Sequence, residues 1–363
     1  MNRVAIAECK KYESSELRRA ILEVIDNSDF PNIEGKSVLL KTNILSDSSP
    51  EKHITTNPDF VETLATICHE KGAREVYIGD SPGLPGPNFK GEGCKIAEVC
   101  RKTGSLWADF SKSTVTRKVW QNIEVPIASI VLDSDIVISV PKMKTHQLMY
   151  ATGAVKNMFG IIPGLNKSPM HLRARSPENF AKFLLSLYEE RVPDYAIMDG
   201  VIAMDGAGPA NGTPRQVGLI IGSKSGIAVD YAQAAIMGYE DNDIPILREA
   251  KRRDKSADDI EYTLLNAKEL SISDFRRIEV KKSNLFSALL LPFFMRSFDR
   301  KKAAKRAAPI FDTERCRKCK KCADICPANA LSFDTGSIKI DTDKCIRCYC
   351  CHEMCPFDAI KID

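Results

Sequence analysis

Short apolar runs recur along residues 1–280, separated by stretches long enough to hold a helix. Several runs are rich in β-branched residues, which is typical of strands buried on both faces of a parallel sheet. We therefore predict that these runs form parallel strands. They are Val4–Ala7, Val38–Thr42, Val76–Ile78, Ile136–Val140, Ala196–Met198 and Val217–Ile221.

Helices are predicted between some of these runs. Apolar residues from Leu17 to Ile25 repeat with the period of an amphipathic helix. Asn57-Pro58-Asp59 and Ser176-Pro177-Glu178 each combine a capping residue, a proline suited to the first turn and an acid, which marks a helix start. This alternation predicts an α/β fold, in which one or more mostly parallel sheets are covered by helices.

Composition narrows the class of protein. The chain has 363 residues, of which 44% are hydrophobic and 28% are charged, so it can bury a core and is not a disordered chain. Its net charge of +4 is too small to predict a nucleic-acid-binding protein. No apolar run reaches the ~18 residues of a membrane-spanning helix, and the first residues do not resemble a secretory signal. We therefore expect a cytoplasmic protein.

The thirteen cysteines are distributed unevenly. Nine of them lie between Cys316 and Cys355, and in a cytoplasmic chain such crowding indicates metal or redox chemistry rather than disulfide bonds. The other four stand singly, without the spacing of metal ligands, and we expect them to be core residues. These four are Cys9, Cys68, Cys94 and Cys100.

The clustered cysteines form an internal repeat with an offset of 29 residues, from Cys316 to Cys345. Each half has the spacing Cys-x2-Cys-x2-Cys-x3-Cys-Pro. In this arrangement three cysteines of one half wrap an iron–sulfur cube, and the fourth, before the proline, ligates the other cube. We therefore expect two [4Fe–4S] clusters. The predicted ligands are Cys316, Cys319, Cys322 and Cys355 for the first cluster, and Cys345, Cys348, Cys351 and Cys326 for the second.

Two alternatives concern these cysteines. Zinc also accepts four thiolates, but a zinc site leaves the repeated Cys-Pro unexplained. Cys350 lies between predicted ligands and is either a small side chain packed near a cluster or a redox-active thiol.

A domain that carries single electrons also implies a partner, and we expect a small electron carrier such as ferredoxin or flavodoxin.

Charge divides the chain into three segments. Residues 1–280 are slightly acidic, residues 281–308 carry eight basic and one acidic side chain, and residues 309–363 are neutral. We assign them to an α/β domain, an amphipathic basic linker and a two-cluster ferredoxin domain. The linker joins an apolar patch to cations, so it could dock the small domain on the large one or lie on a membrane surface. Docking is favoured because Pro292 interrupts the patch.

Polar groups directly follow four of the predicted strands. If these strands are parallel, the groups meet at the carboxyl edge of one sheet, where open α/β sheets bind ligands. Lysines directly after buried strands imply an anionic ligand, such as a carboxylate or a phosphate. The residues are Lys41 and Asn43, then Asp80, then Lys142, Lys144 and His146, then Asp199 and Asp205; Lys156 and Asn157 form a fifth group.

We assign roles to these residues as hypotheses. Three lysines, Lys41, Lys142 and Lys144, are predicted to bind the anion, together with Asn43, Asn157 and Asp199. Either His146 or Lys156 is predicted to handle protons, because a histidine titrates near neutral pH. Asp80 and Asp205 are predicted to orient the basic groups or to bind a metal.

Purely structural interpretations, without a role in binding or catalysis, stay open for several of these motifs. His146 could be a core histidine with satisfied hydrogen bonds, and Gly79–Gly83 could be only a turn. The chain carries no phosphate-loop or dinucleotide fingerprint.

Four motifs together resemble one family. They are Val140-Pro-Lys142-Met-Lys144-Thr-His146, Lys156-Asn157-Met-Phe-Gly160, the region from Asp199-Gly200 through Asp205-Gly-Ala-Gly-Pro209 to Gly212, and Cys345-Ile-Arg-Cys-Tyr-Cys-Cys-His-Glu-Met-Cys-Pro356. Over nearly its full length the chain resembles the domain-of-unknown-function 362 family of iron–sulfur proteins. The resemblance implies an α/β domain fused to a two-cluster ferredoxin domain, mostly in anaerobes, and it implies no particular reaction. The lysine–histidine group is also similar, by fold analogy only, to nickel-pincer lactate racemases.

Together these observations predict a cytoplasmic, oxygen-sensitive redox protein. We expect its ferredoxin domain to relay electrons between a small carrier and an anionic substrate or cofactor at the sheet edge. Two other classes stay open. One is a module that transfers electrons or delivers clusters to a partner enzyme without a substrate of its own, and the other is a sensor that reads cluster state. Nucleic acid is not expected as a partner, and membrane contact is not favoured.

Overall fold

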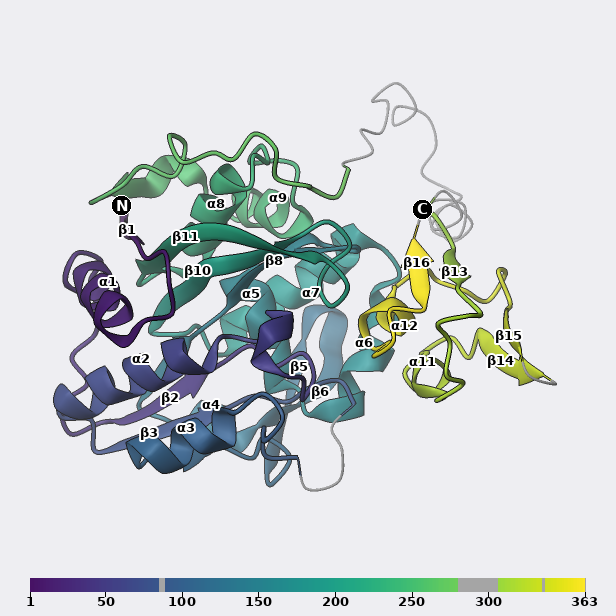
Figure 1. The fold of residues 1–363 in the computed structure, drawn as a ribbon, viewed down its shortest axis with the longest axis horizontal. Helices are drawn as coiled ribbons and strands as arrows, with labels where there is room; N and C mark the ends of the chain where they lie inside the picture. Colours follow the sequence, from purple (N-terminus) through teal and green to yellow (C-terminus); the bar gives the residue numbers. More distant parts are fainter. Residues whose placement is uncertain (85–88, 280–305, 335–336, 363) are drawn as a thin grey trace.

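The computed structural model describes residues 1–84, 89–279, 306–334 and 337–362. Its centre is a ten-stranded sheet (Figure 1). The strands are β1 (Asn2–Glu8), β2 (Ser37–Lys41), β3 (Glu75–Gly79), β4 (Leu106–Trp107), β7 (Ile136–Ser139), β8 (Lys142–His146), β9 (Tyr150–Thr152), β10 (Tyr195–Asp205), β11 (Thr213–Ser223) and β12 (Ile260–Tyr262). Their order is β12-β1-β11-β10-β7-β2-β3-β4, with β8 beside β10 and β9 beside β8. Most neighbouring strands are parallel, which confirms the predicted α/β class.

All six predicted strands are present, but two expectations about them were wrong. Val217–Ile221 lies in β11, which is antiparallel to both of its neighbours because the chain returns directly from β10 through a short connection. Ala196–Met198 is only the start of β10, so Asp199 lies inside a strand rather than after one. Lys142–His146 is likewise a strand, β8, which pairs in parallel with the later part of β10.

Helices cover both faces of the sheet (Figure 1). Alternate residues of β2 face opposite cores: Leu39 packs in one, and Val38 and Leu40 pack in the other. The helices on the Val38 side are α1 (Ser14–Asp26), α2 (Pro58–Glu70) and α3 (Ile96–Thr103). Those on the Leu39 side include α5 (Ala154–Asn157), α7 (Pro177–Glu190), α8 (Gly226–Ile236) and α9 (Pro245–Arg252).

The remaining elements of the large domain are short. An antiparallel pair is formed by β5 (Thr114–Val119) and β6 (Ile123–Ala128). The short helices are α4 (Ser129–Asp133), α6 (Ser168–Ala174), η1 (Pro50–Lys52), η2 (Trp120–Asn122), η3 (Met158–Ile161), η4 (Gly164–Lys167) and η5 (Ala257–Asp259).

The predicted helix starts and core cysteines are confirmed. The Asn57 side chain accepts the backbone N–H groups of Asp59 and Phe60, and the Ser176 side chain accepts that of Asn179. The four isolated cysteines, Cys9, Cys68, Cys94 and Cys100, are all buried.

The C-terminal domain is small and contains both helices and strands. It consists of β13 (Pro309–Phe311), α11 (Lys321–Asp324), β14 (Leu331–Asp334), β15 (Ser337–Ile340), α12 (Cys350–Glu353) and β16 (Ile360–Ile362). The sequence repeat is also a backbone repeat. Lys318 and Lys320 adopt left-handed φ values, and so do Arg347 and Tyr349 at the same offset. The two cysteine loops therefore have the same shape.

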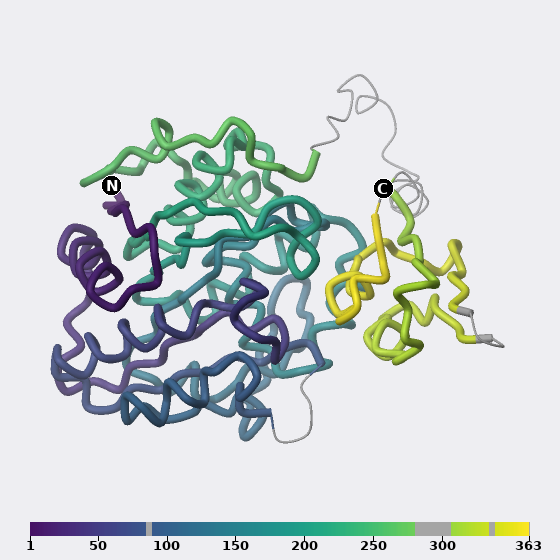
Figure 2. Tube along the Cα trace, viewed as in Figure 1, coloured from purple at the N-terminus to yellow at the C-terminus, as the bar shows by residue number. Residues whose placement is uncertain are grey.

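This domain packs against the carboxyl edge of the large sheet, with α12 on the near side and α11 on the far side (Figures 1 and 2). The Ser168 hydroxyl donates to Ile325 O at 2.6 Å. The His352 ring lies 3.1 Å from Ala207 O, and Asn211 donates to His352 O at 3.2 Å. The glycine-rich segment after β10 thus serves as a docking surface for the small domain.

Most of the predicted basic linker, residues 281–308, lies outside the described residues, so its docking role stays a prediction. Arg306, within the described range, donates to the carbonyls of Arg175 and Ile346. None of the helices in the described ranges is long and apolar enough to cross a membrane.

Candidate functional site

Four strands that carry predicted site residues end at one edge of the sheet. Lys41 at the end of β2 lies opposite Gly79 of β3 on one side and Ser139 of β7 on the other. Ser139 in turn lies opposite Ala196 of β10, and all three pairings are parallel. The polar groups that follow or extend these strands therefore share one edge, as the pattern of apolar runs predicted.

Lys41 is fully buried and has partners within the protein. Its Nζ lies 2.8 Å from Asp80 Oδ1 and donates to Asn157 Oδ1 at 3.1 Å. Asp80 also accepts the backbone N–H groups of Ile44 and Ser81. Burial lowers the pKa of Lys41, and Asp80 opposes that shift. The pair holds the loops after β2 and β3 together, so Asp80 orients a basic group as predicted for it.

Lys142 also bonds side chains of the protein, at a different part of the sheet edge from Lys41. Its Nζ lies 2.7 Å from Asp199 Oδ2 and 2.6 Å from the hydroxyl of Tyr12, which donates to Asp199 Oδ1. Burial lowers the pKa of Lys142, and Asp199 opposes it. Asp205 is bound by the Arg276 guanidinium at 2.7 Å. Lys142 and Asp199 thus bond each other and Tyr12, and Asp205 bonds Arg276, so the ligand-binding roles of Lys142, Asp199 and Asp205 stay predictions.

Lys144 is buried, and within the described ranges no carboxylate forms an ion pair with it. Its ammonium group donates to Asn43 Oδ1 at 2.7 Å and to Ile54 O at 2.6 Å. Burial, followed by the neighbouring Lys156 and Lys142, lowers its pKa to about 7. Lys144 therefore holds Asn43 in place and adds positive potential without touching the ligand space.

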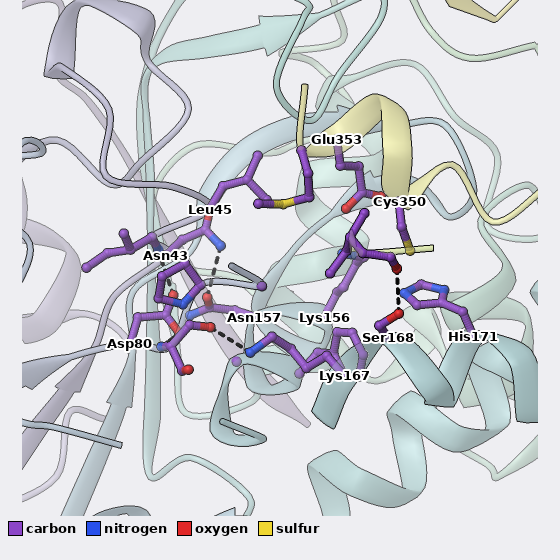
Figure 3. Close-up of a pocket in the computed structure, with 18 residues that line it drawn as sticks. Asn43, Leu45, Asp80, Lys156, Asn157, Lys167, Ser168, His171, Cys350 and Glu353 are labelled. Carbon is purple, nitrogen blue, oxygen red and sulfur yellow. Dashed lines mark hydrogen bonds between the residues drawn. The ribbon is translucent and has the colours of Figure 1, made fainter. Parts of the chain in front are cut away.

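A hollow lies between the large domain and the C-terminal domain (Figure 3). Its volume is about 660 Å³, including the part that opens to solvent. From the large domain its walls include Asn43, Asp80, Lys156, Asn157, Lys167 and His171; from the C-terminal domain they include Ile325, Cys350, Glu353 and Met354. The site thus forms only when the two domains are docked.

Lys156 is the cation in this hollow that has no hydrogen bond or ion pair within the described part of the chain. It is carried by α5, whose first backbone N–H groups, those of Ala154 and Val155, bond the buried carboxylate of Asp230. Gly153 makes this possible, because a Cβ atom there would lie 2.1 Å from Asp230 Oδ1. Burial lowers the pKa of Lys156, and Glu353 opposes that shift.

The hollow and its surroundings have an excess of basic groups. Lys167 is buried and donates to the carbonyls of Ser81 and Ile162, and burial lowers its pKa to about 7. Four lysines, Lys41, Lys144, Lys156 and Lys167, therefore face two carboxylates, Asp80 and Glu353. Because the lysines outnumber the carboxylates, the hollow favours an anion.

His146 and Glu353 meet across the domain boundary. His146 Nε2 lies 2.9 Å from Glu353 Oε1, although the angle is too poor for a hydrogen bond. His146 Nδ1 accepts the backbone N–H groups of Leu148 and Met149, so the proton of the neutral ring is on Nε2, toward the glutamate. Burial lowers the pKa of His146 to about 4, so the ring is neutral at pH 7.

The sequence motifs did not indicate two important members of the site. His171, from α6, is buried, its Nδ1 has no hydrogen-bond partner among the residues that the structure describes, and burial lowers its pKa to about 3. Glu353 lies between predicted cluster ligands and reaches into the hollow from α12. Neither residue follows a strand of the sheet, so only the docking of the domains could have revealed them.

The predicted cluster ligands are grouped as their spacing requires. Four of them line one hollow of the C-terminal domain: Cys316, Cys319, Cys322 and Cys355. Burial raises the pKa of Cys351, and the nearby thiols of Cys348, Cys345, Cys326 and Cys322 add to that shift, so predicted ligands of both clusters lie near Cys351.

Backbone donors also point at the sulfur atoms, as thiolate ligands require. Ala330 N–H lies 3.4 Å from Cys326 Sγ, and Ala359 N–H lies 3.3 Å from Cys355 Sγ. Within the described residues no three His, Cys, Asp or Glu side chains are placed to hold a single metal ion. The four cysteines that line one hollow fit a cubane cluster, whose four iron atoms each take one thiolate.

Cys350 is not in either ligand set. It is buried and lines the interdomain hollow beside Glu353. Its burial agrees with the interpretation of a small packed side chain, and the alternative of a redox-active thiol stays a hypothesis.

An α/β domain docked on a domain with paired cluster-binding loops defines an iron–sulfur protein of the electron-transfer type. Residues 315–359 match the 4Fe-4S dicluster domain, and residues 38–235 match the family described as Domain of unknown function (DUF362). Because the second match covers more than half of the chain, this protein belongs to the DUF362 family.

Three further proteins are similar. The Thylakoid-associated protein sll1697 of Synechocystis sp. is 27% identical over 283 residues, which are 76% of this chain and 88% of that protein. The lactate racemase apoprotein from Thermoanaerobacterium thermosaccharolyticum aligns at 11% identity and a TM-score of 0.46, covering 65% of this chain and 56% of that one. A Thermotoga maritima protein aligns at 11% identity and a TM-score of 0.38, covering 55% and 52%. This chain thus spans little more than half of either solved chain.

Proposed function

We propose that this protein is an oxidoreductase whose C-terminal domain exchanges single electrons with a small anion held in the interdomain hollow. One observation carries the proposal: Lys156, a cation without a partner in the described residues, and Cys350, which lies between predicted cluster ligands, line the same hollow. A ligand bound there contacts both domains. When bound by Cys345, Cys348, Cys351 and Cys326, a [4Fe–4S] cluster supplies single electrons.

In this proposal Lys156 binds the anion, because the ammonium groups of Lys41, Lys142 and Lys144 already have partners. Lys144 and Lys167, whose pKa values burial lowers to about 7, contribute positive charge only in their protonated form. Asn157 positions the site rather than the ligand: its amide donates to Lys41 O and Ser139 Oγ, and its oxygen accepts from Lys41.

Protons at this site are assigned to His146 and Glu353. The neutral imidazole holds its proton on Nε2, beside Glu353 Oε1. Glu353 lines the hollow, so it is placed between that proton and a bound ligand. A substrate that loses a proton together with an electron would find the Glu353 carboxylate here as the proton acceptor, and the Nε2–H of the neutral His146 ring faces that carboxylate.

The test uses anaerobically purified protein with its iron content measured. The protein is reduced, excess reductant is removed, and a panel of small carboxylates and phosphates is added while the visible absorbance of the clusters is followed. We expect one class of anion to reoxidise the protein and to bind it by calorimetry. Lys156→Gln should weaken that binding by about tenfold or more, since it removes a charged contact in a partly buried site.

The control is Lys224→Gln, which changes an exposed lysine of the large domain and should leave binding unchanged. Reoxidation by carrier proteins alone, with no anion bound, would contradict the proposal and support an electron-transfer module without its own substrate.

A further inference from the structure

The two cysteine loops of the C-terminal domain have the same backbone shape but opposite surroundings. At the repeat offset, Arg317 corresponds to Ile346, Lys320 to Tyr349 and Lys321 to Cys350. Arg317, Lys320 and Lys321 of the first loop are thus replaced by apolar or small residues in the second, whereas Lys318 corresponds to another cation, Arg347. A difference confined to one half of a repeat indicates that the two loops meet different neighbours.

The second loop faces the large domain. Tyr349 and Cys350 are each only 5% exposed, and Cys350 lines the interdomain hollow. Ile346 lies beside Leu148 and His171 of the large domain. The composition of this loop therefore follows from the docking of the two domains.

The first loop faces solvent on the far side of the domain, where α11 and the β14–β15 hairpin lie (Figure 1). Cys319, a predicted cluster ligand, is exposed. Four exposed cations surround it: Arg317, Lys318, Lys320 and Lys321. We call this set the basic face.

The basic face is not neutralised by the protein. The ion pairs among the described residues include none made by its four cations, whereas Arg315 is bound by Asp312 and Asp358. The nearby acids Glu314 and Asp324 are exposed and leave the face with a positive balance. An exposed apolar side chain lies close to the basic face: Phe357 is 42% exposed and lines the same hollow as Cys319, Arg317 and Lys320.

We propose that the basic face is the docking surface for an acidic electron-carrier protein of the ferredoxin or flavodoxin class. Positive charge around an exposed cluster loop steers an acidic partner into contact and raises its association rate. Phe357 supplies an apolar contact beside these cations. Electrons thus enter at the first loop and leave at the second, next to Lys156. The assignment rests on the proposed ligation of both clusters.

The test uses full-length, anaerobically purified protein with its iron content and cluster spectra recorded. One variant carries Arg317→Gln, Lys318→Gln, Lys320→Gln and Lys321→Gln. Its control carries Lys36→Gln, Lys224→Gln, Lys251→Gln and Lys268→Gln, which remove the same charge from exposed positions of the large domain. Binding of an acidic ferredoxin is measured by surface-immobilised kinetics at low and high salt, and electron transfer by stopped flow.

We expect the basic-face variant to lose about tenfold or more in association rate at low salt and to lose most of its salt dependence. The control should stay within about twofold of the native protein. If the variant with four substitutions loses iron, the single variant Lys318→Gln is measured instead, with Lys251→Gln as its control. An equal loss in variant and control, or no loss in either, would overturn the proposal.

Two further measurements separate this proposal from failure of the anion site and from membrane binding. Lys156→Gln should leave ferredoxin association unchanged, so failure at the hollow and failure at the basic face are distinguishable. Vesicles with anionic headgroups are tested in parallel. Binding to vesicles that needs the basic face, with ferredoxin association independent of it, would identify a membrane-contacting surface and overturn the proposal.

Discussion

His146 of the large domain and Glu353 of the C-terminal domain approach to 2.9 Å, between Nε2 and Oε1, in a buried place where the two domains meet. The sheet edge thereby contacts α12, the helix between predicted ligands of both clusters. This contact, rather than the sheet edge alone, defines the candidate site.

Removal of the glutamate should loosen this junction. Glu353→Ala removes the carboxylate that lies 2.9 Å from His146 Nε2 and leaves a cavity between the domains, which should cost about 0.5–3 kcal/mol. We expect faster hydrogen exchange of the Leu148 and Met149 amides, which bond His146 Nδ1. Asp324→Ala changes the exposed repeat equivalent of Glu353 and should leave these amides protected. Equal exchange in both variants would contradict a role in docking.

The buried Lys41–Asp80 pair makes a prediction about stability. Asp80→Ala leaves a buried ammonium group without its carboxylate, which typically costs about 3–5 kcal/mol. The double change Lys41→Met with Asp80→Leu removes both charges and should cost clearly less. Denaturant unfolding under anaerobic conditions measures both values. A double variant as unstable as the single one would show that the charge pair is not the cause.

Gly153 is predicted to admit no side chain. A Cβ atom would lie 2.1 Å from Asp230 Oδ1, so Gly153→Ala must displace the carboxylate that bonds the start of α5. We expect a loss of about 1–3 kcal/mol, with weaker anion binding because Lys156 moves with the helix. In the matched control, Gly83→Ala, the nearest contact is Met354 Sδ at 3.5 Å, an ordinary van der Waals distance. The Gly83→Ala variant should unfold at the same denaturant concentration as the native protein.

Burial of Lys144 should contribute a rise in stability between pH 7 and about 10. The pKa of Lys144 falls from 10.5 to about 7 on burial, so in this range the unfolded chain holds a proton that the folded chain has lost. The unfolded state then binds more protons, and stability increases with pH by at most about 1.4 kcal/mol per pH unit for each such group. Lys167, also shifted to about 7, adds a second contribution.

The variants Lys144→Met and Lys224→Met separate this effect from other titrations. Anaerobic denaturation across pH 7 to 9.5 should give a shallower slope for Lys144→Met only. An unchanged slope would mean that Lys144 stays charged in the folded protein.

The cysteine assignment can be tested by iron content. Cys319→Ser removes a predicted ligand of the first cluster and should lower iron and sulfide while most of the iron of the second cluster remains. Cys350→Ser, at the cysteine outside both ligand sets, should keep both clusters. Elemental analysis with electron paramagnetic resonance distinguishes the two outcomes, and full iron in Cys319→Ser would refute the ligand assignment.

Local patterns predicted the fold well because each depends on neighbouring residues. The apolar runs located the strands, and Asn57 and Ser176 marked helix starts whose capping bonds are present. The direction of β11 was missed, since an apolar run looks the same in parallel and antiparallel neighbours. The lysines were correctly placed at the sheet edge, but their partners were not foreseen. Lys142 bonds Tyr12 and Asp199, which are far apart in the sequence.

By itself, the sequence determined that this chain is an α/β protein with a repeated cysteine domain, because residue periodicity and ligand spacing are local properties. Only the tertiary structure decided which cation is left without a partner, and which face of the repeat turns toward the large domain. Burial and charge pairing depend on every element packed nearby, and here the decisive neighbours, Lys156 and Glu353, come from different domains.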